Sequence, residues 1–244
     1  MKRTALLSLF LLLFVSCKED EPNVVDEEEL LGWTKVIIPD GREAHGIAGS
    51  IDDTLLVTTM MTAYFTTDGG ETWQESPDFG GTVYDVVERN DTVYALWATG
   101  SLRDYVGPPF IADQEYAGIA NQYTTDYGGT WQYSTNRSQH DIISPIGVTT
   151  SGSGTTYRIK HNITPLNPDT TSYRTNYSTV EMYHQGFWQT IEFPFEYVLN
   201  NLHVDENNRL YVSASTWQYV LDNQIPGPDE SYPGLVYIYH EPVP

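Results

Sequence analysis

Two short segments of the sequence share an order of residue types that could either bind a cation or shape a turn. They read TTDGGETW at 66–73 and TTDYGGTW at 124–131, and their aspartates lie 58 positions apart. A calcium ion takes about six to eight oxygen ligands, which is more than one such segment displays. An aspartate that accepts bonds from nearby backbone N–H groups, followed by a glycine at positive φ, is typical of a tight turn. We therefore expect two structural turns and no metal site, and the residues that form them are Thr66, Asp68, Gly70, Thr72, Trp73, Thr124, Asp126, Gly128, Thr130 and Trp131.

Residues suited to ligand binding are concentrated in two long segments outside these turns, 98–122 and 215–234. Both combine aromatic rings with carboxylates and amides, which suits sugars because their C–H faces stack on rings while their hydroxyls find acceptors. Long segments also use aromatic side chains simply to pack against their own domain, and this structural role is the alternative. The candidate ligand-binding residues are Arg103, Asp104, Tyr105, Phe110, Tyr116, Trp217, Tyr219 and Asp222.

The motifs of common catalytic and cofactor sites are missing from the sequence. Its six histidines include no pair at the His-x-His or His-x₃-His spacing of metal ligands. A phosphate-binding glycine loop, a metalloprotease motif and a nucleophile elbow are also absent. We therefore expect no metal and no cofactor. Carboxylates are abundant, so a hydrolase that uses two of them stays open as an alternative.

The elements that must position these residues are expected to be short β-strands. Before each repeated turn the chain runs through an apolar strand, a turn rich in aspartate and asparagine, and a second strand of alternating pattern. Short strands at regular spacing with turn signals between them predict an all-β repeat. A third, degenerate copy places His184 58 positions after Asp126 and keeps Gly186 and Trp188. A fourth copy reaches Tyr239 and lacks the turn and the tryptophan.

The missing end of the fourth copy is found near the amino terminus. The segment LGWTKV at 31–36 looks like the last strand of a repeat whose beginning is absent. A ring closes if this strand completes the last unit, and closure removes two exposed sheet edges. We therefore predict an all-β fold, a closed β-propeller with four four-stranded blades in which the N-terminal strand completes the last blade. Five blades, with one blade hidden in 97–123, is the alternative.

The repeated segments match the pattern Thr-x-Asp-x-Gly-x-Thr-Trp, which resembles the Asp-box, or BNR repeat, of sialidases and many other β-propellers. In those families the motif lies at the rim of the propeller, so the resemblance implies a structural motif. Sialidases also hold the substrate carboxylate with three arginines and use a Tyr–Glu pair and an aspartate in catalysis. Their opening arginine motif has no match here, and Arg42 is the nearest residue. The resemblance therefore implies a non-catalytic member that binds a glycan or a protein, with a glycoside hydrolase and an assembly factor for a membrane complex as alternatives.

The amino-terminal sequence predicts export and lipid attachment. Residues 1–16 have a positive start and an apolar run too short for a hydrocarbon core of about 30 Å, as in a signal peptide. The letters FVSC, ending at Cys17, resemble a bacterial lipobox, which implies cleavage before Cys17 and a lipid attached to it. Residues 17–29 are acidic and are expected to form a flexible tether, and 18–21 resemble the export signal of Bacteroidetes surface lipoproteins. We expect residues 30–244 to form the propeller, lipid-anchored to the outer membrane and exposed on the cell surface.

The charge of the chain excludes one class of partner. The formal net charge is −21, and a surface this negative repels phosphate backbones, so we expect no nucleic-acid partner. Neutral ligands such as glycans, and basic protein surfaces, are compatible with it. The sequence does not identify the ligand.

Overall fold

The computed structural model describes residues 32–39, 43–101, 114–135, 142–165, 173–175, 177–193, 197–215 and 233–244. In these ranges the regular secondary structure consists of β-strands, numbered β1 to β19, with no helix. The described part of the chain accordingly holds no helix that is long and apolar enough to cross a membrane. The cysteine and the acidic segment, at 17–29, lie outside the described residues.

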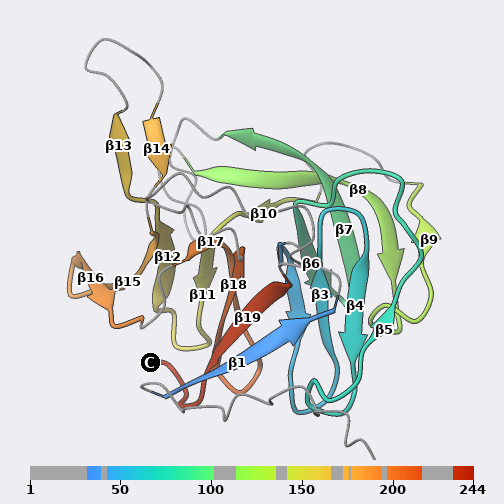
Figure 1. Ribbon diagram of the computed structural model, residues 1–244, viewed down its shortest axis with the longest axis horizontal. Coiled ribbons are helices and arrows are strands. Elements are labelled where there is room, and N and C mark those ends of the chain that lie inside the picture. Colours follow the sequence, from blue (N-terminus) through green and yellow to red (C-terminus); the bar gives the residue numbers. More distant parts are fainter. Residues whose placement is uncertain are drawn as a thin grey trace, which may run out of the picture.

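Four antiparallel sheets of four strands are arranged as the blades of a propeller, which confirms the predicted fold (Figure 1). Each of the first three blades uses four strands in chain order from the inside outwards, and two further short strands form a separate hairpin. Blade 1 is β2 (Ile47–Gly49), β3 (Leu55–Thr58), β4 (Ala63–Thr66) and β5 (Gln74–Glu75). Blade 2 is β6 (Asp85–Arg89), β7 (Thr92–Ser101), β8 (Glu115–Thr124) and β9 (Gln132–Tyr133), and β10 (Ser144–Pro145) also pairs with β8. Blade 3 is β11 (Val148–Thr150), β12 (Thr156–Lys160), β15 (Thr179–His184) and β16 (Phe187–Ile191), and the separate hairpin is β13 (Ile163–Pro165) with β14 (Tyr173–Thr175).

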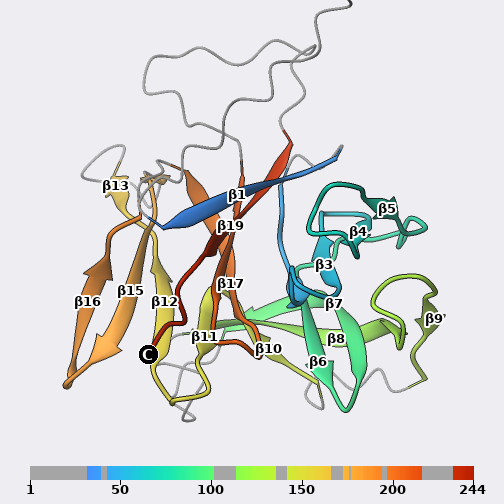
Figure 2. The ribbon, with the colours of Figure 1, turned by 90° about the horizontal axis from the view of Figure 1, so that it is seen from below.

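Blade 4 is built from both ends of the described chain. It consists of β17 (Val198–Val204), β18 (Leu210–Ser215) and β19 (Gly234–Tyr239), and β1 (Trp33–Ile38) pairs antiparallel with β19 as its outermost strand (Figure 2). Trp33 is the pairing partner of Tyr239, as the predicted closure requires. The Trp33 side chain is 1% exposed, and its ring lies 5.0 Å from those of Tyr239 and Phe193. The circle of four blades is therefore closed by the pairing of β1 with β19 and by the aromatic packing around Trp33.

The apolar core is divided among the boundaries between neighbouring blades. Three clusters of buried residues join blades 3 and 4, blades 4 and 1, and blades 1 and 2, and each includes a tryptophan from an outermost strand or from the residue just before it: Trp33, Trp73 and Trp131. The cluster beside blade 2 on its other side is smaller, with Leu96, Ala117 and Ala120 as its buried members. Burying these faces provides the main driving force for assembly, since apolar burial contributes roughly 25 cal/mol per Å².

Alternation of strand direction separates the connections onto two faces of the propeller. First-to-second and third-to-fourth strand connections leave one face, which we call the turn face, and all of these connections are short. Second-to-third strand connections leave the opposite face, which we call the loop face. There the connections span residues 59–62 in blade 1, 102–114 in blade 2, 161–178 in blade 3 and 216–233 in blade 4.

Candidate functional site

The first repeated turn, 66–73, is organised by the carboxylate of Asp68. The hydroxyl of Thr66 donates to Asp68 Oδ1 at 2.7 Å, and the backbone N–H of Thr72 donates to the same oxygen at 2.9 Å. The Thr72 hydroxyl donates to Asp68 Oδ2, and the N–H of Gly70 donates to Thr66 Oγ1 at 3.0 Å. Hydrogen bonds from Thr72 and then Thr66 lower the pKa of Asp68 to about 2, so the carboxylate stays ionised.

The second repeated turn, 124–131, reproduces this arrangement. Thr124 and Thr130 bond to the Asp126 carboxylate, with the Thr130 N–H 2.8 Å from Oδ1 and the Thr124 hydroxyl 2.6 Å from it. The hydrogen bond from Thr124 is the largest cause that lowers the pKa of Asp126. Both turns join the third and fourth strands of a blade. Because the threonine and aspartate side chains of the motif bond to one another inside the turn, hydrogen bonding accounts for these residues without a ligand.

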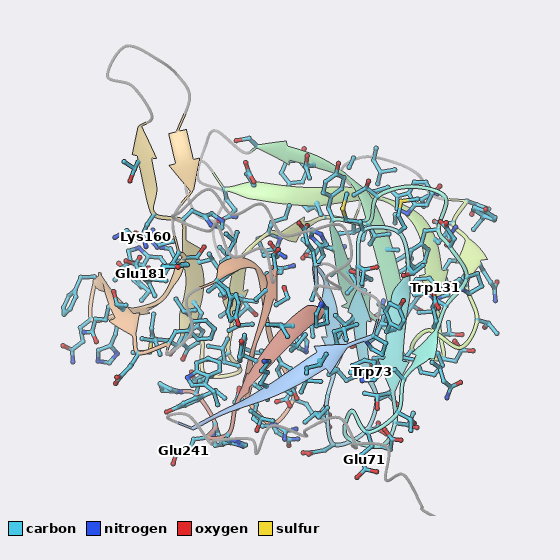
Figure 3. The ribbon with its side chains drawn as sticks, in the orientation of Figure 1. Glu71, Trp73, Trp131, Lys160, Glu181 and Glu241 are labelled. Carbon is cyan, nitrogen blue, oxygen red and sulfur yellow. The ribbon has the colours of Figure 1, made fainter. Side chains whose placement is uncertain are left out.

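Glycine and tryptophan in these turns pack against the preceding blade. Gly128 has φ 108°, and a side-chain carbon placed there would lie 2.8 Å from Leu56 and 3.0 Å from Phe65. Gly70 has φ 90°, and its corresponding neighbour, Val36, would lie 3.3 Å away. The rings of Trp73 and Trp131 lie in the boundaries between blades (Figure 3). These turns therefore join blades as well as strands.

Blade 3 makes the same connection with a different turn. His184, in the sequence position that corresponds to the aspartates, pairs with Phe187 across a two-residue turn whose members, Gln185 and Gly186, have φ of 51° and 90°. The tryptophan of this copy, Trp188, lies under the guanidinium of Arg158, 4.0 Å from the ring centroid.

Arg158 and Lys160 in turn bind the buried carboxylate of Glu181, at 2.6 Å and 3.3 Å respectively (Figure 3). In blades 1 and 2 the motif tryptophan makes apolar contacts with the preceding blade. In blade 3 the corresponding tryptophan packs instead against a cluster of ion pairs within its own blade.

A cavity of about 450 Å³ lies at the centre of the ring. All four blades contribute their innermost strands to it, and β10 supplies a further wall. Its size falls in the range of about 300–1,000 Å³ that is usual for ligand sites. The described residues that line it are Ile47, Ala48, Asp85, Val86, Val87, Glu88, Ser144, Pro145, Val148, Thr149, Thr150, Leu202 and His203.

Asp85 is the most buried acid of the cavity wall, with 3% of its surface exposed. Its Oδ1 accepts bonds from the backbone N–H of Val86 at 2.7 Å and from Nδ2 of Asn201 in blade 4 at 2.6 Å. The side-chain Oδ1 of Asn201 accepts a hydrogen bond from the backbone N–H of Gly147, just before blade 3, at 2.7 Å. Burial raises the pKa of Asp85 to about 7, and hydrogen bonds from Ser144, Val86 and Asn201 oppose the increase. The Asp85 carboxyl, through its bond with Asn201, therefore helps to join blades 2, 3 and 4. The spacing of residues along the sequence gave no signal for the contact between Asp85 and Asn201.

Most of the predicted ligand-binding residues lie outside the described part of the chain. Arg103, Asp104, Tyr105 and Phe110 fall in 102–113, and Trp217, Tyr219 and Asp222 fall in 216–232. Tyr116 is described; it lies in β8, is 7% exposed and packs over Gly100 of β7. Much of the segment 98–122 is therefore strand, because β7 and β8 extend the hairpin of blade 2 instead of forming an additional blade.

A third long connection, 161–178 in blade 3, was not recognised from the sequence, because its residues read as part of a degenerate repeat. It contains the β13–β14 hairpin, which projects away from the ring (Figure 1). Its extra length relative to blade 1 is the signal that could have identified it.

Fold and cavity together define a four-bladed β-propeller with a central site. The sequence matches no protein-family model and no curated protein. Among solved structures, the chain is similar to one described as YCF48 bound to D1 peptide, with 14% sequence identity and a TM-score of 0.26. That match covers 76% of this chain and 66% of the other chain, so it spans slightly less than two thirds of the length of that protein.

Proposed function

We propose that this chain is a non-catalytic binding module of the Asp-box type, displayed on the outer membrane through a lipid on Cys17. In this proposal residues 1–16 are the signal peptide, 17–29 are the tether and 30–244 are the propeller. The ligand is a glycan or a protein, bound at the loop face. The observation that carries the proposal is that three of the four second-to-third strand connections are long and leave the same face of a closed ring.

The location of these connections supports a shared binding surface. Blade 1 joins its second and third strands with residues 59–62, which shows that the fold itself needs only a short connection. The other three blades use connections several times longer, and loops held on a rigid scaffold commonly carry binding residues. The candidate aromatic residues Tyr105, Trp217 and Tyr219 belong to two of these connections.

The ion pairs of two described arginines support a non-catalytic role. A sialidase-like mechanism needs free guanidinium groups to bind a substrate carboxylate. Here Arg158 binds Glu181, while Arg209 binds Asp205 and Asp52. These two guanidinium groups serve ion pairs within and between blades, so they are not available as a carboxylate clamp.

Ligand binding is best tested with the full chain, solubilised in detergent, on a glycan array and in pull-downs from outer membranes. We expect Trp217→Ala and Tyr105→Ala each to weaken binding at least tenfold without lowering the melting temperature. Tyr133→Ala is the matched control, because Tyr133 is 68% exposed on β9 of blade 2. Binding that survives both loop substitutions but is lost in the control would contradict the loop-face site. Hydrolysis of fluorogenic glycosides by the purified chain would contradict the non-catalytic role.

Lipid attachment has an independent test. Cells expressing the full chain are labelled with an alkyne analogue of palmitate, and the Cys17→Ser variant is compared. We expect label and membrane association in the native chain and neither in the variant. External protease should remove the native protein from intact cells if it is displayed on the surface, and persistent protection would contradict surface display.

A further inference from the structure

The central cavity has a polar mouth that is distinct from the loop-face site. Its acidic wall runs from Asp85, which is 3% exposed, along β6 to the exposed Glu88 next to the first-to-second strand turn of blade 2. That turn lies on the turn face. The wall formed by β6 therefore reaches solvent at the turn face.

Two polar side chains near this mouth, His203 and Glu88, offer hydrogen-bond acceptors. The Nε2 atom of His203 lies 2.9 Å from the carbonyl oxygen of Gly49 and must carry the hydrogen, since a carbonyl only accepts. Burial lowers the pKa of His203, so the ring is neutral and its Nδ1 carries a lone pair. Glu88 interacts electrostatically with this ring and contributes a carboxylate.

Several acidic side chains lie near the mouth, and the basic Arg89, which follows Glu88 in β6, donates a hydrogen bond to the carbonyl oxygen of Ile143. The hydroxyl of Tyr127 donates a hydrogen bond to Glu88 Oε1 at 2.6 Å, which holds the Glu88 carboxylate in place at the mouth of the cavity. Asp91 and Asp53, from the first-to-second strand turns of blades 2 and 1, interact with the same tyrosine. Among the described residues that line the cavity, none is a lysine or an arginine. The mouth thus combines acceptors with an excess of negative charge.

The rest of the cavity wall is mixed, with the hydroxyl residues Ser144, Thr149 and Thr150 and a set of apolar side chains. Ile47 and Ala48 from blade 1, Val148 from blade 3 and Leu202 from blade 4 all face the cavity. A ligand that fits this lining has a short aliphatic stem and a group rich in N–H donors. An anion is disfavoured by Glu88. A bound metal ion is not favoured either, because the described residues contain no group of three or more ligating side chains suited to one.

We propose that the cavity binds an aliphatic ammonium or guanidinium group that enters from the turn face, with its charge at Glu88 and its stem against the apolar side chains of the wall. The group belongs either to a free polyamine or to the side chain of a lysine or arginine in a basic segment. Charge-assisted hydrogen bonds to a carboxylate in a partly enclosed site supply the affinity. This site is additional to the loop-face site and does not depend on it.

The test is isothermal titration of the full chain with spermidine and, separately, with Nα-acetyl-lysine amide. Diacetyl-lysine amide, which has the same stem without the charge, is the neutral probe. We expect saturable binding with one site for a charged probe and none for the neutral one. Preference for spermidine assigns the site to a polyamine, whereas preference for the lysine amide assigns it to a basic side chain.

Glu88→Gln tests the assignment to this cavity. Glu88 is exposed, so the substitution should leave the fold intact, and a thermal melt checks this. We expect at least a tenfold loss of affinity for the charged probe. The matched control is Glu75→Gln, an exposed glutamate on β5 of blade 1 that does not line the cavity, which should bind as the native chain does. Equal effects of the two substitutions, equal binding of the neutral probe, or no saturable binding would each overturn the proposal.

Discussion

The aspartates of the two repeated turns and the aspartate of the central cavity stabilise this propeller in different ways. Asp68 and Asp126 lie in exposed turns at the turn face, remain ionised and bond within their own segments. Asp85 lines the central cavity and bonds to Asn201 of blade 4, and burial raises its pKa to about 7. The difference shows that local sequence motifs set the geometry of each blade, whereas burial and partners distant in sequence set the geometry of the ring.

The largest expected effect concerns the pH dependence of stability at Asp85. An unfolded aspartate has a pKa of about 3.9, whereas folding raises that of Asp85 to about 7. The folded state therefore binds more protons, and its stability falls as pH rises from about 4 to about 7, by up to about 4 kcal/mol for this group.

Asp85→Asn should remove this contribution, because an amide keeps the acceptor oxygen and has no proton to lose. Urea unfolding at pH 4.5 and pH 8 in both proteins measures the change. An unchanged difference between the two pH values in the variant would show that Asp85 is ionised in the folded channel.

The next largest effect is expected at the glycines of the repeated turns. Gly128→Ala introduces a carbon 2.8 Å from Leu56 at φ 108°, so strain and overpacking should together cost about 3 kcal/mol. Gly69→Ala, at φ 76° with open space around it, should cost only about 1 kcal/mol and is the matched control. Thermal and urea unfolding give both values, and equal losses would refute the close contact between blades.

A smaller effect is expected when the turn carboxylates are removed. Asp68→Ala and Asp126→Ala each leave two threonine hydroxyls and a backbone N–H without their acceptor. Thr72 and Thr130 are exposed and can bond to water instead, whereas Thr66 and Thr124 are buried and keep the bonds that they accept from backbone N–H groups, such as those of Gly70 and Gly128. The melting temperature should fall less than in Gly128→Ala. Affinity for any loop-face ligand should not change, and a large loss of affinity at native stability would identify the turns as a binding site.

The smallest effect is a pKa change within one turn. Thr72→Val removes the hydroxyl that bonds to Asp68 Oδ2 and should raise the pKa of Asp68 from about 2 towards its ordinary value. A carboxylate with a lowered pKa stabilises the fold above about pH 4 and loses this contribution as pH falls towards 2. Carboxyl chemical shifts measured by NMR follow both aspartates, and Asp126 in the same protein is the control. No shift at Asp68 would mean that the hydroxyl bond has no influence.

Much of the ring could be predicted from sequence because its information is repeated. Each blade carries its own strand and turn signals, and the segment at Trp33 supplies what the copy ending at Tyr239 lacks. The third turn was predicted less well: its position follows from the spacing, but Gln185-Gly186 forms a two-residue hairpin in place of the aspartate turn.

The central site could not be predicted in the same way. Asp85 and Asn201 are 116 residues apart and no motif connects them. Likewise, Glu88 and His203 come together only because the innermost strands of blades 2 and 4 face one channel. Such pairs depend on the closed arrangement of blades, which spacing along the chain does not reveal.

Closure of the ring by β1 also determines when the protein can finish folding. Thr34 bonds to His240 across 206 residues, so the fourth blade needs two segments that are far apart in the sequence. Non-local pairing of this kind slows folding, because a long stretch of chain must be ordered before the contact forms. The first three blades can pair their own strands before β19 pairs with β1, so we expect this pairing to form late in folding. Until that pairing forms, β1 and β19 each present an open edge to which a strand of another molecule could add.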